Sequence, residues 1–308
     1  MARRSNRGVA LITAVLITAL VSLTAVNMAA RQTLDLRRTA NVIDGGRAYA
    51  FALGVESWVR QVLLRDKKSS TTDHLGEDWA VQLPPLEVEG ATVGGRLEDM
   101  QGRFNINNLL GEDGGPSALD VQRFRRLLDH FNAPKELSDA VVDWLDGDSD
   151  THFPGGAEDG DYLHRQPPYR AANQTMVSPS ELLLIKGFDR EIYRQLAPFI
   201  CALPTRTAIN VNTAPAEVLM ALADNVSRED AEMLIAEREE SGFSSVEAFV
   251  QHDALAGRGV NEDGLSVSSD YFLMDARTTF GRARAHLYSL LRRTEEGTDV
   301  LWRARGAY

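Results

Sequence analysis

The sequence predicts an α+β fold with one long amino-terminal helix and an antiparallel sheet, interrupted by a large α-helical insertion domain. An apolar stretch followed by helical periodicity covers residues 9–66, and period-two segments occur at 86–100 and near the carboxyl end. Between these strands, residues 104–260 show mostly helical patterns. Because strands stand on both sides of the helical segment, we expect both ends of the chain to build one sheet.

The composition is that of a globular protein with an acidic surface. Of 308 residues, 44% are hydrophobic and 25% charged, and the formal net charge is -11. This charge argues against a surface that binds nucleic acid or anionic lipid. The single cysteine, Cys201, excludes an internal disulfide, and its apolar neighbours predict that it is a buried core residue.

Residues 9–30 predict a transmembrane segment. They are uncharged, and a helix of that length rises roughly 33 Å, which matches the hydrocarbon core of a bilayer. A cleaved secretory signal is the alternative, although its apolar region is usually only about 7 to 15 residues long. Three arginines within residues 1–8 favour a cytoplasmic amino end, and the arginines that follow from Arg31 weaken this asymmetry.

A basic leader, residues 1–8, ends at Gly8 directly before the apolar segment. This layout resembles that of type IV prepilins and type II secretion pseudopilins, whose dedicated peptidase cuts after the glycine. The resemblance implies that prepilin peptidase removes the leader, that Val9 becomes the methylated first residue, and that residues 9–30 remain as an anchor.

Position five of the implied mature chain is Thr13, where most pilin-like subunits carry glutamate. That glutamate neutralises the amino terminus of a neighbouring subunit, and an unpaired charge inside a bilayer costs about 2.5 to 3.5 kcal/mol. A subunit at the filament tip has no neighbour above it, so Thr13 favours a tip position. A plain anchor helix that never needed the glutamate is the alternative.

Residues 31–103 are expected to continue the helix and to begin the pilin-like body. Apolar residues at three- and four-residue spacing predict one buried helix face, with polar side chains opposite, and Gly45 and Gly46 could kink the helix. The apolar set is Phe51, Val55, Trp58, Val59 and Val62, and the polar set is Glu56, Ser57, Arg60 and Gln61. Further strands are predicted at 271–274, 283–288 and 300–303, within a carboxyl-terminal segment 266–308.

The insertion, residues 104–265, contains two related helical units. Segments 104–110 and 209–215 share an Asn-x-Asn core, and 178–183 matches 244–249 so that Glu181 pairs with Glu247. The asparagines are expected to be caps and turn formers, namely Asn105, Asn107, Asn210 and Asn212.

The second unit resembles a helix-hairpin-helix module of competence-type DNA receptors, so a membrane-anchored DNA-binding receptor is the alternative function. The hairpin glycines are replaced at 223–227, however, and residues 217–253 hold ten acids against two arginines. This charge would repel phosphate, so we expect the unit to contact proteins and no nucleic acid.

An acidic loop, residues 139–164, is the strongest chemical signal. Nine acids and no basic residue lie between Lys135 and Arg165. Two like charges about 4 Å apart repel by roughly 4 kcal/mol at an effective dielectric near 20, so convergence of these groups requires a cation. Calcium accepts six to eight oxygens and is the natural candidate. Asp139 and Asp143 precede the acidic run on a helix and are expected to form its solvated face.

Other interpretations of the acidic loop stay open. It is not an EF-hand, because Thr151 stands where that motif has glycine. Magnesium is less suited to so many carboxylates, and zinc would require His152 or His164. The acids could instead extend separately into solvent.

The chain resembles the K-class minor pseudopilins of type II secretion systems in several features. These are the leader, Thr13, the interrupted body, the paired Asn-x-Asn units, and the sequence DWLDGDSD followed by GAEDGDY. The resemblance implies a type IV pilin-like fold with a helical insertion that binds one or two Ca²⁺ ions. Motif positions carry over as candidate ligands Asp146, Asp148, Asp150, Glu158, Asp159 and Asp161.

The same resemblance implies a role at the tip of the pseudopilus, where the subunit initiates assembly and caps the filament. It implies minor pseudopilins of the I and J classes as partners, followed by the H class and the major pseudopilin. The expected location is the inner membrane, crossed once, with the carboxyl-terminal domain in the periplasm. An enzyme is not expected, because HExxH, GxSxG, GxGxxG and P-loop motifs are absent from the sequence.

Overall fold

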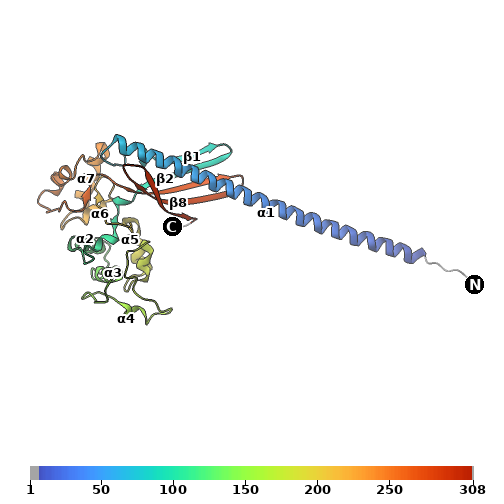
Figure 1. The fold of residues 1–308 in the computed structure, drawn as a ribbon, viewed down its shortest axis with the longest axis horizontal. Helices are drawn as coiled ribbons and strands as arrows, with labels where there is room; N and C mark the ends of the chain where they lie inside the picture. Colours follow the sequence, from blue (N-terminus) through green and yellow to red (C-terminus); the bar gives the residue numbers. More distant parts are fainter. Residues whose placement is uncertain (1–6, 307–308) are drawn as a thin grey trace, which may run out of the picture.

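The computed structural model of the chain describes residues 7–306, apart from the side chains of Arg7 and Glu240. Most of the predicted leader, residues 1–6, therefore lies outside the described residues. The helix α1 (Arg7–Ser69) is continuous and passes through Gly45 and Gly46, and Figure 1 shows it as a rod that projects far beyond the body. Residues 8–43 are exposed, and this part contains a window of mean hydropathy 2.5, apolar enough to cross a membrane.

The carboxyl-terminal half of α1 packs on the sheet through a buried stripe. Its members follow helical spacing and are Ala48, Ala52, Glu56, Val59 and Leu63. Trp58 is 54% exposed and Glu56 only 4%, so the sequence prediction was wrong for both residues. Sequence periodicity cannot reveal a distant partner, and here Arg303 donates to Glu56 Oε2 at 2.7 Å. Burial alone would raise the pKa of Glu56, but hydrogen bonds from Arg303 and Ser289 outweigh it and the pKa is lowered.

Five antiparallel strands form the sheet in the order β1-β2-β7-β8-β9. Their bounds are β1 (Leu83–Val88), β2 (Ala91–Asp99), β7 (Tyr271–Phe280), β8 (Ala283–Arg293) and β9 (Thr298–Arg305). Two-residue pairs β3 (Phe104–Asn105) with β4 (Ile200–Cys201), and β5 (Ile209–Asn210) with β6 (Leu265–Ser266), are parallel. The long helix, the antiparallel sheet and the further helices confirm the predicted α+β class.

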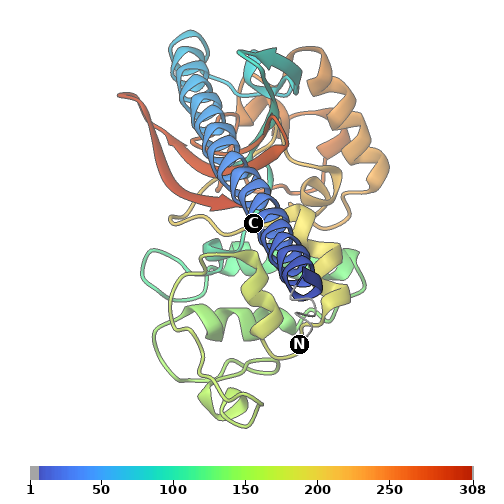
Figure 2. The ribbon, with the colours of Figure 1, turned by 90° about the vertical axis from the view of Figure 1, so that its right-hand side faces the viewer.

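The insertion leaves the sheet after β2 and returns at β7. These strands are direct neighbours, with Asp99 opposite Phe272. Figure 1 shows the inserted helices at the end of the body farther from the amino terminus, with α4 at the lower extreme. Figure 2 shows the molecule from the side of the amino terminus, with α1 running obliquely across the body. The helices are α2 (Ala118–His130), α3 (Leu137–Leu145), α4 (Asp159–Tyr162), α5 (Arg190–Leu196), α6 (Ala216–Met220), α7 (Arg228–Ser241) and α8 (Val246–Val250). Short 3₁₀ helices are η1 (Asp78–Ala80), η2 (Met100–Gly102), η3 (Ile106–Leu109), η4 (Pro179–Leu184), η5 (Ala197–Phe199) and η6 (Asp253–Leu255).

The two faces of the sheet have different partners because alternate residues of a strand point in opposite directions. Phe272, Met274 and Ala276 of β7 belong to the apolar cluster under α1. Tyr271 and Leu273 belong to a cluster that includes Cys201 of the insertion. Cys201 is fully buried, as predicted. The insertion thus packs against the face of the sheet that α1 leaves open, while its helices share one large core of their own.

The two units of the insertion repeat one hydrogen-bond arrangement. Asn107 exchanges bonds with both backbone groups of Met176, and Asn212 does so with Phe243. Asn105 and Asn210 each accept the N–H of the residue two positions on, as expected for turn formers.

The structural alignment of the units differs from the predicted one. Ser178 lies two residues after Met176, and Ser245 lies two residues after Phe243; both are helix N-caps. Ser178 therefore corresponds to Ser245, and the predicted match of 178 with 244 was one residue off. Asn107 and Met176 are 69 positions apart in the first unit, whereas Asn212 and Phe243 are 31 positions apart in the second. The first unit is longer because it contains the acidic loop.

Candidate metal centre

The acidic loop folds back over α3 instead of extending from it. Every residue of α3 is buried, including Asp139 at 5% and Asp143 at 0% exposure, so the predicted solvated face is wrong. Asp139 binds Arg125 at 2.7 Å and accepts the Gly155 N–H at 3.2 Å. These contacts exist because distant chain segments supply the donors, and buried carboxylates are tolerated when they are hydrogen-bonded.

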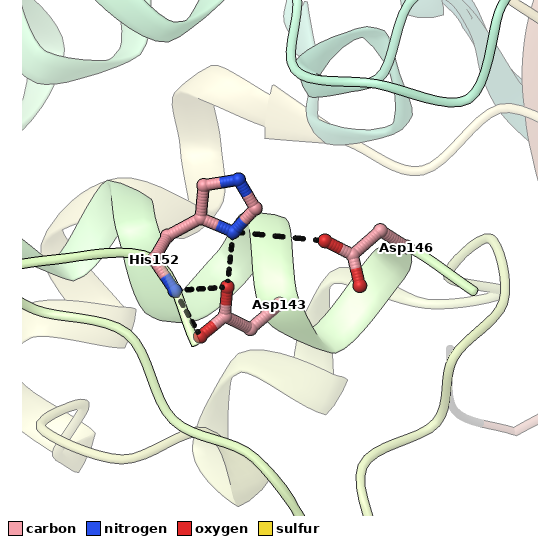
Figure 3. Close-up of side chains that lie close together, drawn as sticks. All are labelled: Asp143, Asp146 and His152. Carbon is pink, nitrogen blue, oxygen red and sulfur yellow. Dashed lines mark hydrogen bonds and ion pairs between the residues drawn. The ribbon is translucent and has the colours of Figure 1, made fainter. Parts of the chain in front are cut away.

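Asp143 anchors the loop. Its Oδ1 accepts the backbone N–H of His152 at 3.1 Å and lies 2.6 Å from the ring Nδ1, as Figure 3 shows. Its Oδ2 accepts the Ala157 N–H at 2.7 Å. A Cβ at Gly156 would lie 2.2 Å from Asp143 Oδ2, so only glycine fits there. The aspartates spaced four apart on α3, before a Gly-Gly pair, were the available sequence signal for this anchoring role.

Three of the predicted ligands converge. One carboxylate oxygen from each of Asp146, Asp148 and Glu158 lies within 4.8 Å of the others. A second cluster joins Asp143, Asp146 and His152 within the same distance, and His152 Nδ1 lies 3.7 Å from Asp146 Oδ2 (Figure 3). Asp146 is common to both clusters.

The donor set fits a hard cation such as calcium. Asp146 and Glu158 are 3% and 7% exposed. Among the described residues, Asp146 Oδ1 and both Glu158 carboxylate oxygens are buried without a hydrogen-bond partner. Burial of an unpaired carboxylate is costly, whereas a divalent cation would satisfy these oxygens.

The crowding of the carboxylates also raises their pKa values. Burial, followed by the charges of Asp143 and Asp146, raises the pKa of Glu158 to about 7. Burial, followed by the charges of Asp148 and Asp143, raises the pKa of Asp146 to about 6. Burial alone would lower the pKa of His152, but its bond to Asp143 outweighs this and the pKa is raised. The raised pKa values of the carboxylates reflect their burial and mutual repulsion.

The structure places the other three predicted ligands outside these clusters. Asp150 is exposed, and its N–H donates to Asp148 Oδ1 at 2.8 Å. Asp161 binds Lys186 at 2.8 Å. Asp159 accepts the Ala171 N–H at 3.1 Å and lies 3.6 Å from Arg170. The chain's own cations therefore compensate Asp159 and Asp161.

Sequence reasoning missed one residue beside the loop. Asn173 donates through Nδ2 to the Asp148 carbonyl at 2.8 Å, and its Oδ1 is buried without a partner in the described part of the chain. Asn173 has a positive φ of 45°, a conformation that asparagine tolerates better than most residues. An Asn-to-carbonyl contact across 25 positions leaves no pattern in the sequence.

The long apolar helix on an antiparallel sheet, with an acidic-loop domain inserted between neighbouring strands, defines a pilin-like subunit with a candidate membrane anchor. Two family models, both described as "Type II secretion system (T2SS), protein K", match residues 102–205 and 209–268. The chain belongs to this type II secretion system protein K family and is a minor pseudopilin.

Relatives and a solved structure support the assignment over nearly the whole chain. Type II secretion system protein K of Pseudomonas aeruginosa is 36% identical over 306 residues, 96% of this chain and 91% of the relative. That of Aeromonas hydrophila is 33% identical, with 97% of both chains covered. A chain of the GspK-GspI-GspJ complex from enterotoxigenic Escherichia coli is similar with a TM-score of 0.77 and 28% identity, covering 88% of this chain and 100% of that one. The alternative of a DNA-binding receptor finds no support in these matches.

Proposed function

We propose that this minor pseudopilin forms the tip of the pseudopilus with minor pseudopilins of the I and J classes, initiates assembly and caps the filament. The observation that carries the proposal is the similarity to a chain of a GspK-GspI-GspJ complex. The H-class and major pseudopilins then join from below. No enzymatic step is part of this role.

The shape of the chain supports capping. The insertion lies at the end of the body away from the projecting helix (Figure 1), where its bulk would obstruct a further subunit. The Thr13 hydroxyl donates to the Val9 carbonyl at 2.9 Å within the helix and leaves no charge for a neighbour above. Both features favour a terminal subunit that accepts additions only from below.

An excess of this subunit is expected to shorten pseudopili, because more caps share the same supply of major pseudopilin. Electron microscopy of filaments from cells that overproduce the chain measures the effect. The control is a variant in which a tight turn between β2 and β7 replaces the insertion, and this variant should not shorten them. Unchanged filament lengths with the intact chain would contradict capping.

Processing and location complete the proposed role. Prepilin peptidase cuts between Gly8 and Val9, the new amino terminus is methylated, and α1 crosses the inner membrane once with the carboxyl-terminal domain in the periplasm. Both residues lie on exposed helix, which is compatible with peptidase access.

Intact mass and amino-terminal sequencing of the protein from its native host test this processing. The expected chain begins at methylated Val9. A chain with Met1 retained, or one that starts beyond Ala30, would contradict the processing and the filament assembly that depends on it.

The acidic loop is proposed to bind calcium, with one ion at Asp146, Asp148 and Glu158 and room for a second ion at Asp143 and His152 beside the shared Asp146. The ion would neutralise the converging carboxylates and fix the loop against α3. The unpartnered buried oxygens of Asp146 and Glu158 support this assignment. Asp150, Asp159 and Asp161 lie outside these clusters, and Asp159 and Asp161 are paired with Arg170 and Lys186.

Calcium affinity is expected to fall at least about tenfold between pH 8 and pH 6, since protons compete for Glu158 and Asp146, whose pKa values are about 7 and about 6. Calorimetry of the full chain in detergent measures the affinity. Asp146→Asn should abolish binding, whereas Asp161→Asn, whose carboxylate is already paired with Lys186, should retain it. Affinity that is independent of pH would exclude these two carboxylates as ligands.

A further inference from the structure

We propose that a second divalent-cation site, separate from the acidic loop, lies at the carboxyl end of α1 and is formed by Asp66, Asp73 and Glu77. One carboxylate oxygen of each residue lies within 4.8 Å of the others. The ligand class is a hard, oxygen-preferring ion such as calcium, because all three ligands are carboxylates. This inference does not depend on the calcium site proposed for the loop.

The three residues come from a short stretch that turns back at the end of the helix. Asp66 lies in the last turn of α1, and Asp73 and Glu77 lie in the connection to η1. Their side chains are 13%, 2% and 12% exposed. The cluster is therefore withdrawn from solvent, where repulsion between carboxylates is poorly screened.

The hydrogen bonds to this cluster use only one oxygen of each carboxylate. Arg293 donates to Asp66 Oδ2 at 2.6 Å and to Asp73 Oδ2. Glu77 Oε2 accepts the N–H of His74 at 3.0 Å and the indole N–H of Trp79 at 2.7 Å.

The unpaired carboxylate oxygen of Asp73 is evidence that the cluster binds a ligand. Asp73 is 2% exposed, and its Oδ1 is buried without a partner among the residues that the structure describes. A buried carboxylate oxygen without a donor is costly, and a cation bound between the three residues would satisfy it.

The charge around the cluster is unbalanced. One arginine, Arg293, faces three carboxylates, and Lys67 instead lies 3.9 Å from Asp270 and 3.6 Å from Glu295. The His74 ring lies 4.0 Å from Glu77 Oε1. Burial, followed by the charge of Glu77, raises the pKa of Asp66 to about 6 despite Arg293. A divalent ion would remove this excess of negative charge.

The position of the site connects three parts of the fold. Asp66 belongs to the stalk helix and Arg293 to β8, while the Asp73 carbonyl accepts Asn210 Nδ2 from the insertion at 3.1 Å. Asp73 Oδ2 also accepts the Ser269 N–H at the return of the chain to the sheet. A bound ion would fix Asp73, which in turn contacts the sheet through Arg293 and the insertion through Asn210.

Terbium luminescence of the full chain in detergent tests the proposal, because Tb³⁺ replaces calcium and the indole of Trp79, bonded to Glu77, can sensitise it. The background is the triple variant Asp146→Asn, Asp148→Asn, Glu158→Gln, which removes the loop cluster. In this background we expect Tb³⁺ emission that excess Ca²⁺ abolishes by displacing Tb³⁺ from the site.

Adding Asp66→Asn or Glu77→Gln should abolish that emission. Two substitutions are used because either one could affect folding, and circular dichroism identifies the folded variants. Asp78→Asn, which changes an exposed neighbour outside the cluster, is the matched control and should keep the emission. Absence of emission in the triple variant, or emission that survives both cluster substitutions, would overturn the proposal.

Discussion

Replacement of Asp143 by alanine is expected to lower the free energy of unfolding by about 3 to 5 kcal/mol, because it leaves buried donors without an acceptor. The backbone N–H groups of His152 and Ala157 and the ring of His152 all meet this carboxylate. Without it, the loop loses its attachment to α3. The variant should therefore also lose the proposed calcium response, although Asp146 and Glu158 are intact.

Urea denaturation of the full chain in detergent measures this loss of stability, and calorimetry measures the calcium response. Asp150→Ala changes an exposed carboxylate of the same loop and is the matched control, expected to shift stability by less than about 0.5 kcal/mol. Equal stabilities of the two variants would show that Asp143 does not anchor the loop.

Asp99→Ala is expected to cost about 3 kcal/mol and to loosen the insertion from the sheet, because buried donors lose their common acceptor. Asp99 is 5% exposed at the end of β2. Its Oδ2 accepts Asn210 Nδ2 at 3.0 Å and the hydroxyls of Thr213 and Ser269 at 2.6 Å, and its Oδ1 accepts the Gln101 N–H at 2.8 Å. These donors come from the start of the second unit and from the segments that flank the insertion.

The cost of Asp99→Ala should also depend on pH. Burial raises the pKa of Asp99 to about 6, despite hydrogen bonds that lower it. A raised pKa in the folded state means that the protonated carboxyl stabilises the fold at low pH and that this contribution is lost as pH rises through about 6. The difference between wild type and variant should therefore grow as pH is lowered from 7 to 5.

Thermal unfolding of the full chain in detergent at these pH values, with limited proteolysis at the insertion boundaries, measures both effects. Thr92→Ala is a control on the same strand, since its hydroxyl bonds only to the exposed Glu87. A cost for Asp99→Ala that is small and does not vary with pH would contradict a linking role for this carboxylate.

The helix and the sheet were predictable because their signals are local. Apolar periodicity located α1, and period-two segments located all five strands of the sheet, although β7, β8 and β9 are longer than their predicted cores. The predicted insertion bounds, 104 and 265, fall within the segment that separates β2 from β7. Because strands lie on both sides of the insertion, one sheet built from both ends of the chain could be inferred. The register of each strand pair could not.

The candidate site was predictable only in part, because burial and pairing depend on distant residues. The repeated aspartates marked the loop, and the structure brings Asp146, Asp148 and Glu158 together. Sequence alone could not show that Lys186 pairs with Asp161 or that the loop buries Asp143. The cluster at Asp66, Asp73 and Glu77 has no motif, since it forms only when the chain turns back at the end of α1.

The neighbouring positions of β2 and β7 have a consequence for synthesis of the chain on the ribosome. About 170 residues separate the paired Asp99 and Phe272, and at about 5 to 20 residues per second their translation takes on the order of ten to thirty seconds. During that delay the insertion can bury its own core, whereas β2 waits with an open edge. A nascent chain would thus fold its insertion domain first and close its sheet last.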